Sequence, residues 1–318
     1  MKLAARIAAL VGLAIALWLI ARNQPVAAWG LLRTAGWGLV AAALIHGLPM
    51  LANAKDWQIV ILGPKRPGLG AMLRLIWLRE SIDGLLPVAR VGGELVAFRL
   101  LRRAGVNASA VVGSLMVDTQ LTLISQLLFM LLGVGYLALQ ANSAALQLAG
   151  KLAWAAAAAT PILVAFALIQ HVKPLERAAR LLNQMVGGKL KEAVGESSEI
   201  DLQVKKIWRH WGIVLQYVFL WQGLQCLGVG LELWAALRFM HASLSLAGAF
   251  ALEALLQALT SVAFFVPGNI GIQEGGFLLI GHALGLDTPT CVALAGARRI
   301  RDLLFYVPGV VYWQFAEK

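Results

Sequence analysis

The sequence predicts an all-α polytopic membrane protein with about six full transmembrane helices and two re-entrant hairpins that form an inverted repeat. Composition is the first reason: of 318 residues, 60% are hydrophobic and 14% are charged, too few polar groups to cover a soluble core. Second, several apolar runs reach the roughly 20 residues that span a bilayer. Third, two Pro/Gly breaks separate apolar segments that are too short to span.

Long apolar runs at 111–139, 152–169 and 211–237 are the clearest candidates for membrane-spanning segments. They lack strand alternation, and backbone groups in hydrocarbon must bond internally, so helices are expected. The run at 4–21 is followed by a poor cleavage site and is expected to be an uncleaved first helix. The expected apolar segments are 4–21, 29–54, 68–86, 92–104, 108–140, 147–170, 209–240, 245–266, 271–285 and 289–314.

Short segments in two consecutive pairs predict hairpins over 68–104 and 245–285. Proline lacks a backbone N–H and glycine tolerates any φ, so a cluster of both ends one helix and begins another. Such short segments are expected to enter and leave the membrane on the same side. The expected break residues are Pro87, Gly92 and Gly93 in the first hairpin, and Pro267, Gly268, Asn269 and Gly271 in the second.

The two hairpins share a residue spacing that predicts an internal repeat. Pro87, Glu94 and Gly105 recur as the same residue types 180 positions later, at 267, 274 and 285. An odd number of expected crossings separates the units, so they point in opposite directions, as in transporters with a midplane ligand site. The alternative is chance recurrence in a glycine-rich chain. The prediction is one integral-membrane domain over 1–318, with repeat A at 29–140, a cytoplasmic loop at 171–208 and repeat B at 209–314.

Lysine and arginine residues determine the expected orientation, because positively charged loops stay on the cytoplasmic side. With a cytoplasmic N-terminus, the basic groups at 2–6, 55–66, 99–103 and 171–209 all fall inside, and the C-terminus is cytoplasmic too. The 171–208 loop is expected to hold a surface helix and to serve as a solvated linker. The net charge of +11 therefore needs no nucleic-acid partner, and no nucleic-acid-binding pattern accompanies it.

Ionisable residues at bilayer depth are costly, so each is expected to have a partner or a function. Glu94 and Glu274 follow the two breaks, in the first turns of the second half-helices. Each either complements the positive end of a helix dipole or binds a ligand or proton, and both alternatives stay open. Asp118 is a further candidate inside an apolar helix, whereas Glu232 is expected at the membrane interface.

The last helix carries a charge cluster formed by Arg298, Arg299, Arg301 and Asp302. One acid cannot neutralise three guanidinium groups, so Glu94 or Glu274 is expected as a further partner. Arginine that lines a cavity suits phosphate through its paired donors. The alternative is that these side chains snorkel to the interface. Further charged candidates in and before the first break are Arg79, Glu80, Asp83 and Arg90.

No catalytic or metal-binding pattern is present. The five histidines are scattered, and Cys226 and Cys291 lack metal-ligand spacing, so neither a metal site nor a disulfide framework is expected. Nucleophile, phosphate-loop and nucleotide motifs do not occur in the sequence. We therefore expect no cofactor and no enzymatic activity.

Two segments around the breaks, LLPVARVGGE at 85–94 and VPGNIGIQEG at 266–275, resemble signatures of the lysylphosphatidylglycerol synthase transmembrane, or flippase-like, family. The resemblance extends over nearly the whole chain, although Asn269 stands where the family usually has glycine. The short chain and its ending Arg298-Arg299-Ile300-Arg301-Asp302-Leu303 resemble the hopanoid-biosynthesis-associated HpnL-type branch. The hairpin residues carried over by this resemblance are Pro87, Gly92, Glu94, Pro267, Gly268, Gly271 and Glu274.

The resemblance implies a bacterial inner-membrane protein that translocates or handles a lipid. We expect the headgroup of a phospholipid or hopanoid-type lipid to enter a polar chamber between the hairpins, bound by Arg90, Arg298 or Arg301. Glu94 and Glu274 would act there as partners or proton carriers. The family's aminoacyl transfer needs a cytosolic domain and is not expected of this chain. The alternative hypothesis is a non-transporting scaffold that presents a polycyclic lipid to a partner enzyme of lipid biosynthesis.

Overall fold

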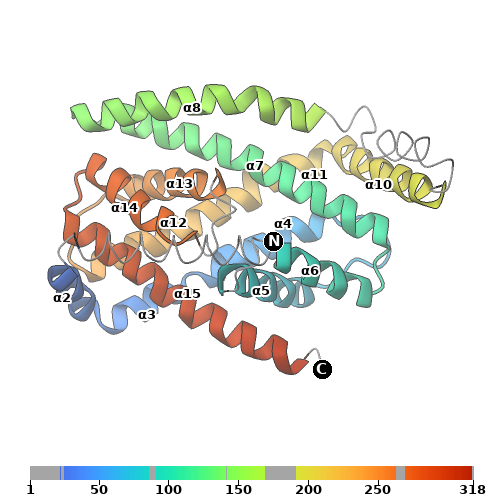
Figure 1. Cartoon of the computed structure of the whole chain (residues 1–318), viewed down its shortest axis with the longest axis horizontal. Coiled ribbons are helices and arrows are strands. Elements are labelled where there is room, and N and C mark those ends of the chain that lie inside the picture. The colour runs from blue at the N-terminus through green and yellow to red at the C-terminus, as the bar shows by residue number, and fades with distance from the viewer. Residues whose placement is uncertain are drawn as a thin grey trace.

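The computed structural model of the chain describes residues 22, 25–85, 91–140, 142–168, 191–262 and 269–316 (Figure 1). Within these ranges the regular elements are all helices. Three of the described helices are long and apolar enough to cross a membrane: Trp37–Val60, Ala108–Ala138 and Trp211–Phe239. The protein is thus a membrane-embedded bundle of helices. The expected first helix at 4–21 lies outside the described residues.

The first half of the described chain differs from the prediction at one segment. The expected single helix at 29–54 is divided into three, because Gly36 has a φ of 48° and a turn follows at Ile45–His46. The elements are α2 (Pro25–Ala35), α3 (Trp37–Leu44), α4 (Gly47–Val60), α5 (Leu69–Leu85), α6 (Val91–Arg103) and α7 (Ala108–Ala138).

The second half begins with the long helix α8 and ends with α15. The expected helix at 209–240 is continuous but contains a wider π-helical turn, a feature often found at functional sites. The elements are α8 (Ser143–Leu168), α10 (Lys191–Arg209), α11 (Trp211–Leu215), η2 (Gln216–Trp221), α12 (Gln222–Phe239), α13 (Leu246–Val262), α14 (Ile272–Ala283) and α15 (Thr288–Ala316).

The helix expected in the 171–208 loop is present as α10, and one face of it is packed against the bundle instead of being fully solvated. It lies against α7 and buries Val204 and Ile207. Gly113 of α7 permits the approach, since a Cβ there would come within 2.9 Å of the Gln203 Cβ. Residues 171–190 lie outside the described ranges.

The corners that follow the two hairpins have the same hydrogen bonds at positions 180 residues apart. Gly105 and Gly285 end α6 and α14 with φ values of 86° and 85°. The next N–H groups, of Val106 and Leu286, donate to carbonyls five residues back at 3.1 and 2.9 Å. Both corners are Schellman caps, in which glycine adopts the left-handed conformation at little cost. The spacing found in the sequence therefore corresponds to equal local geometry.

Each hairpin packs against the long helix of the other half. Helix α5 lies against α15, whereas α13 lies against α7, and α4 packs against α12 between them. Figure 1 shows the α6–α7 corner and the α14–α15 corner at opposite ends of the molecule. This exchange of partners is the arrangement expected of two repeats related by a two-fold axis. It brings α4, α5, α12 and α15 together at the centre.

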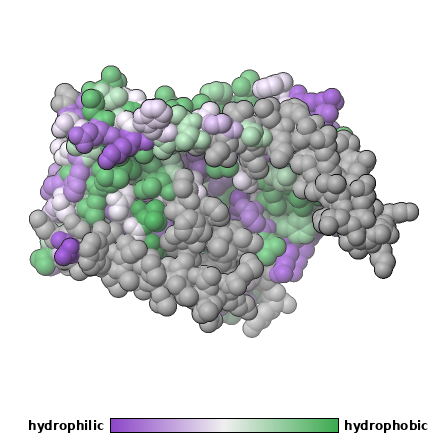
Figure 2. Space-filling model, turned by 45° about the horizontal axis from the view of Figure 1, so that its top comes forward, coloured by the Kyte–Doolittle hydropathy of each residue, from purple (hydrophilic) through white to green (hydrophobic). Residues whose placement is uncertain are grey.

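Large apolar side chains remain exposed on the outer helices. Trp37, Leu132 and Trp154 are 86%, 71% and 80% exposed. Figure 2 shows hydrophobic groups on the described surface between clusters of hydrophilic ones. A soluble protein rarely exposes such continuous apolar surface, whereas lipid covers it at no cost. Several charged side chains, by contrast, are buried in the interior of the bundle.

Candidate functional site

The first group of buried charges surrounds Arg79 of α5. Its guanidinium forms ion pairs with Glu94 of α6 and, at 3.2 Å, with Asp118 of α7. The Tyr217 hydroxyl, from the π-helical turn, donates to Asp118 at 2.6 Å. Arg79 also lies 4.8 Å from the ring centroid of Trp57. Two residues singled out in the sequence, Glu94 and Asp118, are thus brought together by one arginine.

Glycine at the start of α6 permits this close hairpin. The Gly93 N–H donates to Asp83 of α5 at 2.8 Å, and a Cβ at Gly93 would come within 2.7 Å of the Arg79 carbonyl oxygen. Only glycine lets α6 approach α5 this closely. Gly92 and Gly93 were expected in the break between the helices, but both lie within the first turn of α6, where the second of them serves close packing. Pro87 and Arg90 lie outside the described residues.

Glu274 of α14 has both a capping contact and an arginine partner. One carboxylate oxygen accepts the Gly271 N–H at 2.6 Å, and the other accepts from Arg299 Nε and Nη2 at 3.0 and 2.8 Å. The expected pairing of Glu274 with the arginine cluster is therefore present. Asn269 has a φ of 49°, a left-handed conformation that Asn adopts more readily than most residues. Pro267 and Gly268 lie outside the described residues.

Each arginine of α15 has its own carboxylate partner. Arg298 pairs with Glu253 of α13, and Arg301 pairs with Asp302 and, at 3.4 Å, with Glu232 of α12. Asp302 also lies 3.6 Å from Arg299. Arg298 and Arg301 are 8% and 6% exposed, so they do not snorkel to the interface.

Glu232 corrects the sequence interpretation. It was expected at the membrane interface, yet its side chain is buried and lies between Arg301 and His46. Its position near the end of an apolar run suggested the interface. Burial results from packing against α4 and α15, which are distant in sequence.

His46 is the functional candidate that the sequence interpretation missed. It is buried at the start of α4, with Nδ1 3.0 Å from both Glu232 Oε2 and Arg301 Nη1. Its Nε2 lies 3.8 Å from Glu80 of α5. Nδ1 cannot donate to the carboxylate and accept from the guanidinium at once, so no single protonation state satisfies both contacts. A lone histidine in an apolar segment was the only sequence signal.

The expected common chamber for Glu94 and Glu274 is not formed by direct contact between them. The two glutamates pair with different arginines, Arg79 and Arg299. The cavity beside Glu232 and Arg301 measures about 20 Å³, roughly the space of one water molecule. Within the described ranges, no group of three or more His, Cys, Asp or Glu is placed to hold a metal ion.

The arrangement is a set of buried ion pairs that bridges helices from both halves of the chain. Charges at this depth persist only with partners, and their partners here lie on other helices. A relative movement of these helices would therefore have to exchange or hydrate the ion pairs. This chemistry suits the binding and release of a polar group inside the membrane.

The family comparison covers both hairpins and most of the ion-pair network. The family model described as the lysylphosphatidylglycerol synthase TM region matches residues 6–309. No curated protein and no solved structure matches the chain. The matching family is a membrane family linked to lipid handling. Because the match spans most of its length, this chain belongs to the lysylphosphatidylglycerol synthase TM region family.

Proposed function

We propose that the protein is a flippase-like lipid transporter of the bacterial inner membrane. One observation carries the proposal: the interface between the two halves of the chain is buried and charged. His46 and Glu80 come from α4 and α5, and Glu232 and Arg301 come from α12 and α15. Transporters with inverted repeats expose a midplane site by moving one repeat against the other. A charged interface supplies that site, whereas an apolar interface would only hold the repeats together.

Partner exchange is the proposed mechanism. Removing one partner of a buried ion pair costs about 3–5 kcal/mol, so an arginine leaves its carboxylate only when another anion replaces it. A lipid phosphate presents such an anion to Arg299 or Arg301, while the acyl or polycyclic part stays in the bilayer. Glu274 is then the partner displaced from Arg299, and Glu94 holds Arg79 in the other half. Either carboxylate can also act as a proton carrier.

The proposed topology places both termini in the cytoplasm and the hairpins in opposite leaflets. Its support is that several basic segments meet at one end of the molecule. Lys65 in the α4–α5 connection lies against Gly105 in the α6–α7 corner, and a Cβ at Gly105 would be 3.2 Å from its side chain. Figure 1 places α10, which carries Lys205 and Lys206, at the same end. By the positive-inside rule this end faces the cytoplasm.

We further propose that the substrate is a phospholipid or a hopanoid-type lipid, and that the chain belongs to the hopanoid-associated branch. The charged ending of Arg298, Arg299, Arg301 and Asp302 supports this assignment. The protein needs no cofactor and performs no covalent chemistry in this proposal.

Reconstitution tests the function. Purified protein in vesicles with fluorescent phosphatidylglycerol should make inner-leaflet lipid accessible to an external quencher faster than protein-free vesicles. Glu94→Gln or Glu274→Gln should slow this about tenfold or more, because the exchange loses its carboxylate. Lys151→Gln, a substitution at an exposed position outside the network, serves as the control. If the wild-type protein moves no lipid, the scaffold alternative gains support; if both Gln variants match wild type, the carboxylates have no role in transport.

A further inference from the structure

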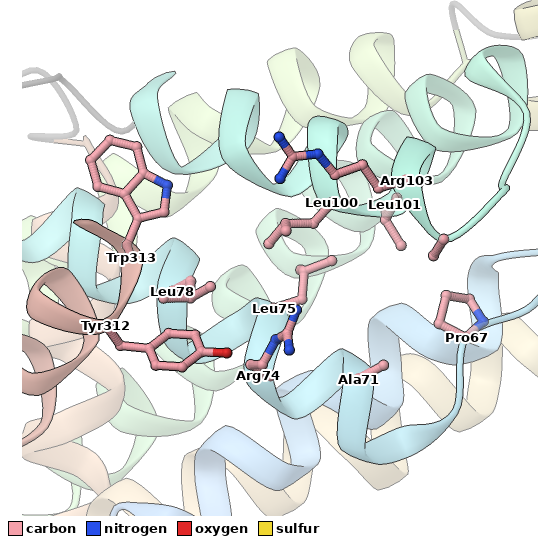
Figure 3. Close-up of a pocket in the computed structure, with 11 residues that line it drawn as sticks. Pro67, Ala71, Arg74, Leu75, Leu78, Leu100, Leu101, Arg103, Tyr312 and Trp313 are labelled. Atoms are coloured by element: carbon pink, nitrogen blue, oxygen red, sulfur yellow. The ribbon is translucent and has the colours of Figure 1, made fainter. Parts of the chain in front are cut away.

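A second cavity lies away from the ion-pair network, between α5, α6 and the end of α15 (Figure 3). Its volume is about 290 Å³, near the lower limit of small-molecule sites. Pro67 and Ala104 line it, so it lies beside the α4–α5 connection and the α6–α7 corner, at the basic end of the molecule. Its apolar wall is formed by Leu75, Leu78, Leu100 and Leu101.

The polar lining of this cavity consists of hydrogen-bond donors. In Figure 3, Arg74 of α5 and Arg103 of α6 reach the cavity from different walls, and Tyr312 and Trp313 of α15 line another side. Arg74 lies 5.8 Å from the Tyr312 ring centroid and has no ion-pair partner among the described residues. The Trp313 Nε1 is buried and has no hydrogen-bond acceptor in the described part of the chain. None of the described residues that line the cavity carries a carboxylate.

The equivalent positions in the other half of the molecule do not carry these arginines. At positions 180 residues away, Arg74 corresponds to Ala254, and Arg103 corresponds to Ala283. Both charges of the cavity are thus replaced by methyl groups. The basic lining is a property of one repeat and does not follow from the shared fold.

The shape also differs between the two places. Trp313 corresponds to Gly133 of α7, where a Cβ would come within 2.9 Å of Leu255 Cγ. Glycine thus allows α7 and α13 to close on each other. The indole of Trp313 occupies the matching position on α15 and lines an open cavity.

We propose that this cavity binds the phosphate group of an anionic amphiphile. The guanidinium forks of Arg74 and Arg103 match phosphate oxygens, and the Trp313 N–H supplies a further donor. The apolar part of the ligand lies along the leucines. The site does not depend on transport, because a ligand can occupy it in a protein that moves no lipid. If the topology is as proposed above, this cavity faces the cytoplasmic side and selects lipids that carry a phosphate there.

The test measures binding by the full-length protein in detergent. Dioctanoyl phosphatidate is titrated and the bound lipid is counted by native mass spectrometry. Arg74→Gln and Arg103→Gln should each weaken binding about tenfold, and the double variant should weaken it further. Arg66→Gln removes the same charge next to Pro67 without lining the cavity, and should change binding less than twofold. Ala71→Phe keeps both arginines but fills the cavity, and should also weaken binding.

Three outcomes would overturn the proposal. Phosphate recognition would be excluded if dioctanoylglycerol, which lacks the phosphate, bound as tightly as dioctanoyl phosphatidate. Unchanged binding by the folded double variant, as judged by an unaltered melting temperature, would exclude these arginines. If inorganic phosphate bound as tightly as dioctanoyl phosphatidate, the leucines would not contribute to binding, and free phosphate would be the ligand. Loss of translocation with intact binding would contradict only the proposed transport.

Discussion

The two halves of the chain share one backbone plan, but their long helices carry opposite charges at an equivalent position. Asp118 of α7 and Arg298 of α15 are 180 residues apart and occupy matching places after equal corners. Asp118 pairs with Arg79 on α5, whereas Arg298 pairs with Glu253 on α13. In each half the long helix and the first hairpin arm form a buried pair, with the signs reversed. Only the positions of Asp118 and Arg298 match at this offset, since Arg79 corresponds to Leu259 and Glu253 corresponds to Leu73.

The difference means that the halves are not interchangeable in function. In the proposed mechanism, a lipid phosphate that reaches the second half meets three arginines on one helix, Arg298, Arg299 and Arg301. In the first half the single Arg79 lies between two carboxylates. The two arginines of the basic cavity beside α6 also have no counterparts in the second half, where Ala254 and Ala283 stand at the equivalent positions. Equal backbone geometry with unequal charge therefore gives the two halves different electrostatic environments.

The largest expected effect comes from breaking one of these reversed pairs. Arg298→Gln leaves the buried Glu253 without its cation, so the free energy of unfolding should fall by about 3 kcal/mol. Adding Glu253→Gln removes the stranded charge and should recover at least half of the loss. Denaturation in detergent, followed by tryptophan fluorescence, measures both. A double variant no more stable than the single one would show that the two charges do not interact.

An intermediate loss of stability is expected at the two glycine corners, where the halves have the same backbone geometry. Gly105→Ala and Gly285→Ala each force a residue with a Cβ into a left-handed conformation, which costs about 1 kcal/mol. Space is not limiting at either place, since nothing lies within 4 Å of a Cβ at Gly285 and only a flexible lysine side chain does at Gly105. The same unfolding measurement should therefore give similar losses. A loss at one corner alone would show that the two corners are not energetically equivalent.

The smallest effect is expected from Arg74→Gln. Among the described residues this arginine has no carboxylate partner, so stability in detergent without lipid should change by less than about 0.5 kcal/mol. Arg79→Gln on the same helix strands Glu94 and Asp118 and should cost several times more. Thermal unfolding of the two variants side by side checks this contrast. A loss above about 1 kcal/mol for Arg74→Gln would indicate a structural role for its contact with Tyr312.

Local sequence features predicted the hairpin helices closely. The expected arms at 68–86 and 271–285 appear as Leu69–Leu85 and Ile272–Ala283. Glycine and proline act on the residues next to them, so their effect is visible without the rest of the molecule. The division of 29–54 was missed because Gly36 is one of four glycines in this apolar run, and the sequence does not show which of them adopts a positive φ. That the hairpins are re-entrant and inverted with respect to the membrane stays a prediction.

The charged site was predicted only in part. Asp118, Glu274 and the arginines of α15 were identified because charge is costly inside an apolar helix. Glu80 and Glu253 have the same signal but could not be assigned to particular pairs. The four-residue spacing of Arg79 and Asp83 suggested an internal pair, whereas Arg79 forms its ion pairs with Glu94 and Asp118. His46 and Glu232 were dismissed, since a single polar residue does not reveal which distant helix lies against it.

By itself the sequence determined that this is a helical membrane protein, where its hairpin helices begin and end, and which positions recur at an offset of 180. Hydrophobicity and backbone restrictions act over short distances, so they are readable along the chain. Only the tertiary structure decided which carboxylate neutralises which arginine, and that Trp313 lines a cavity where Gly133 permits close packing. These outcomes depend on how helices far apart in sequence cross, and a few ångströms in that crossing separate an ion pair from a binding site.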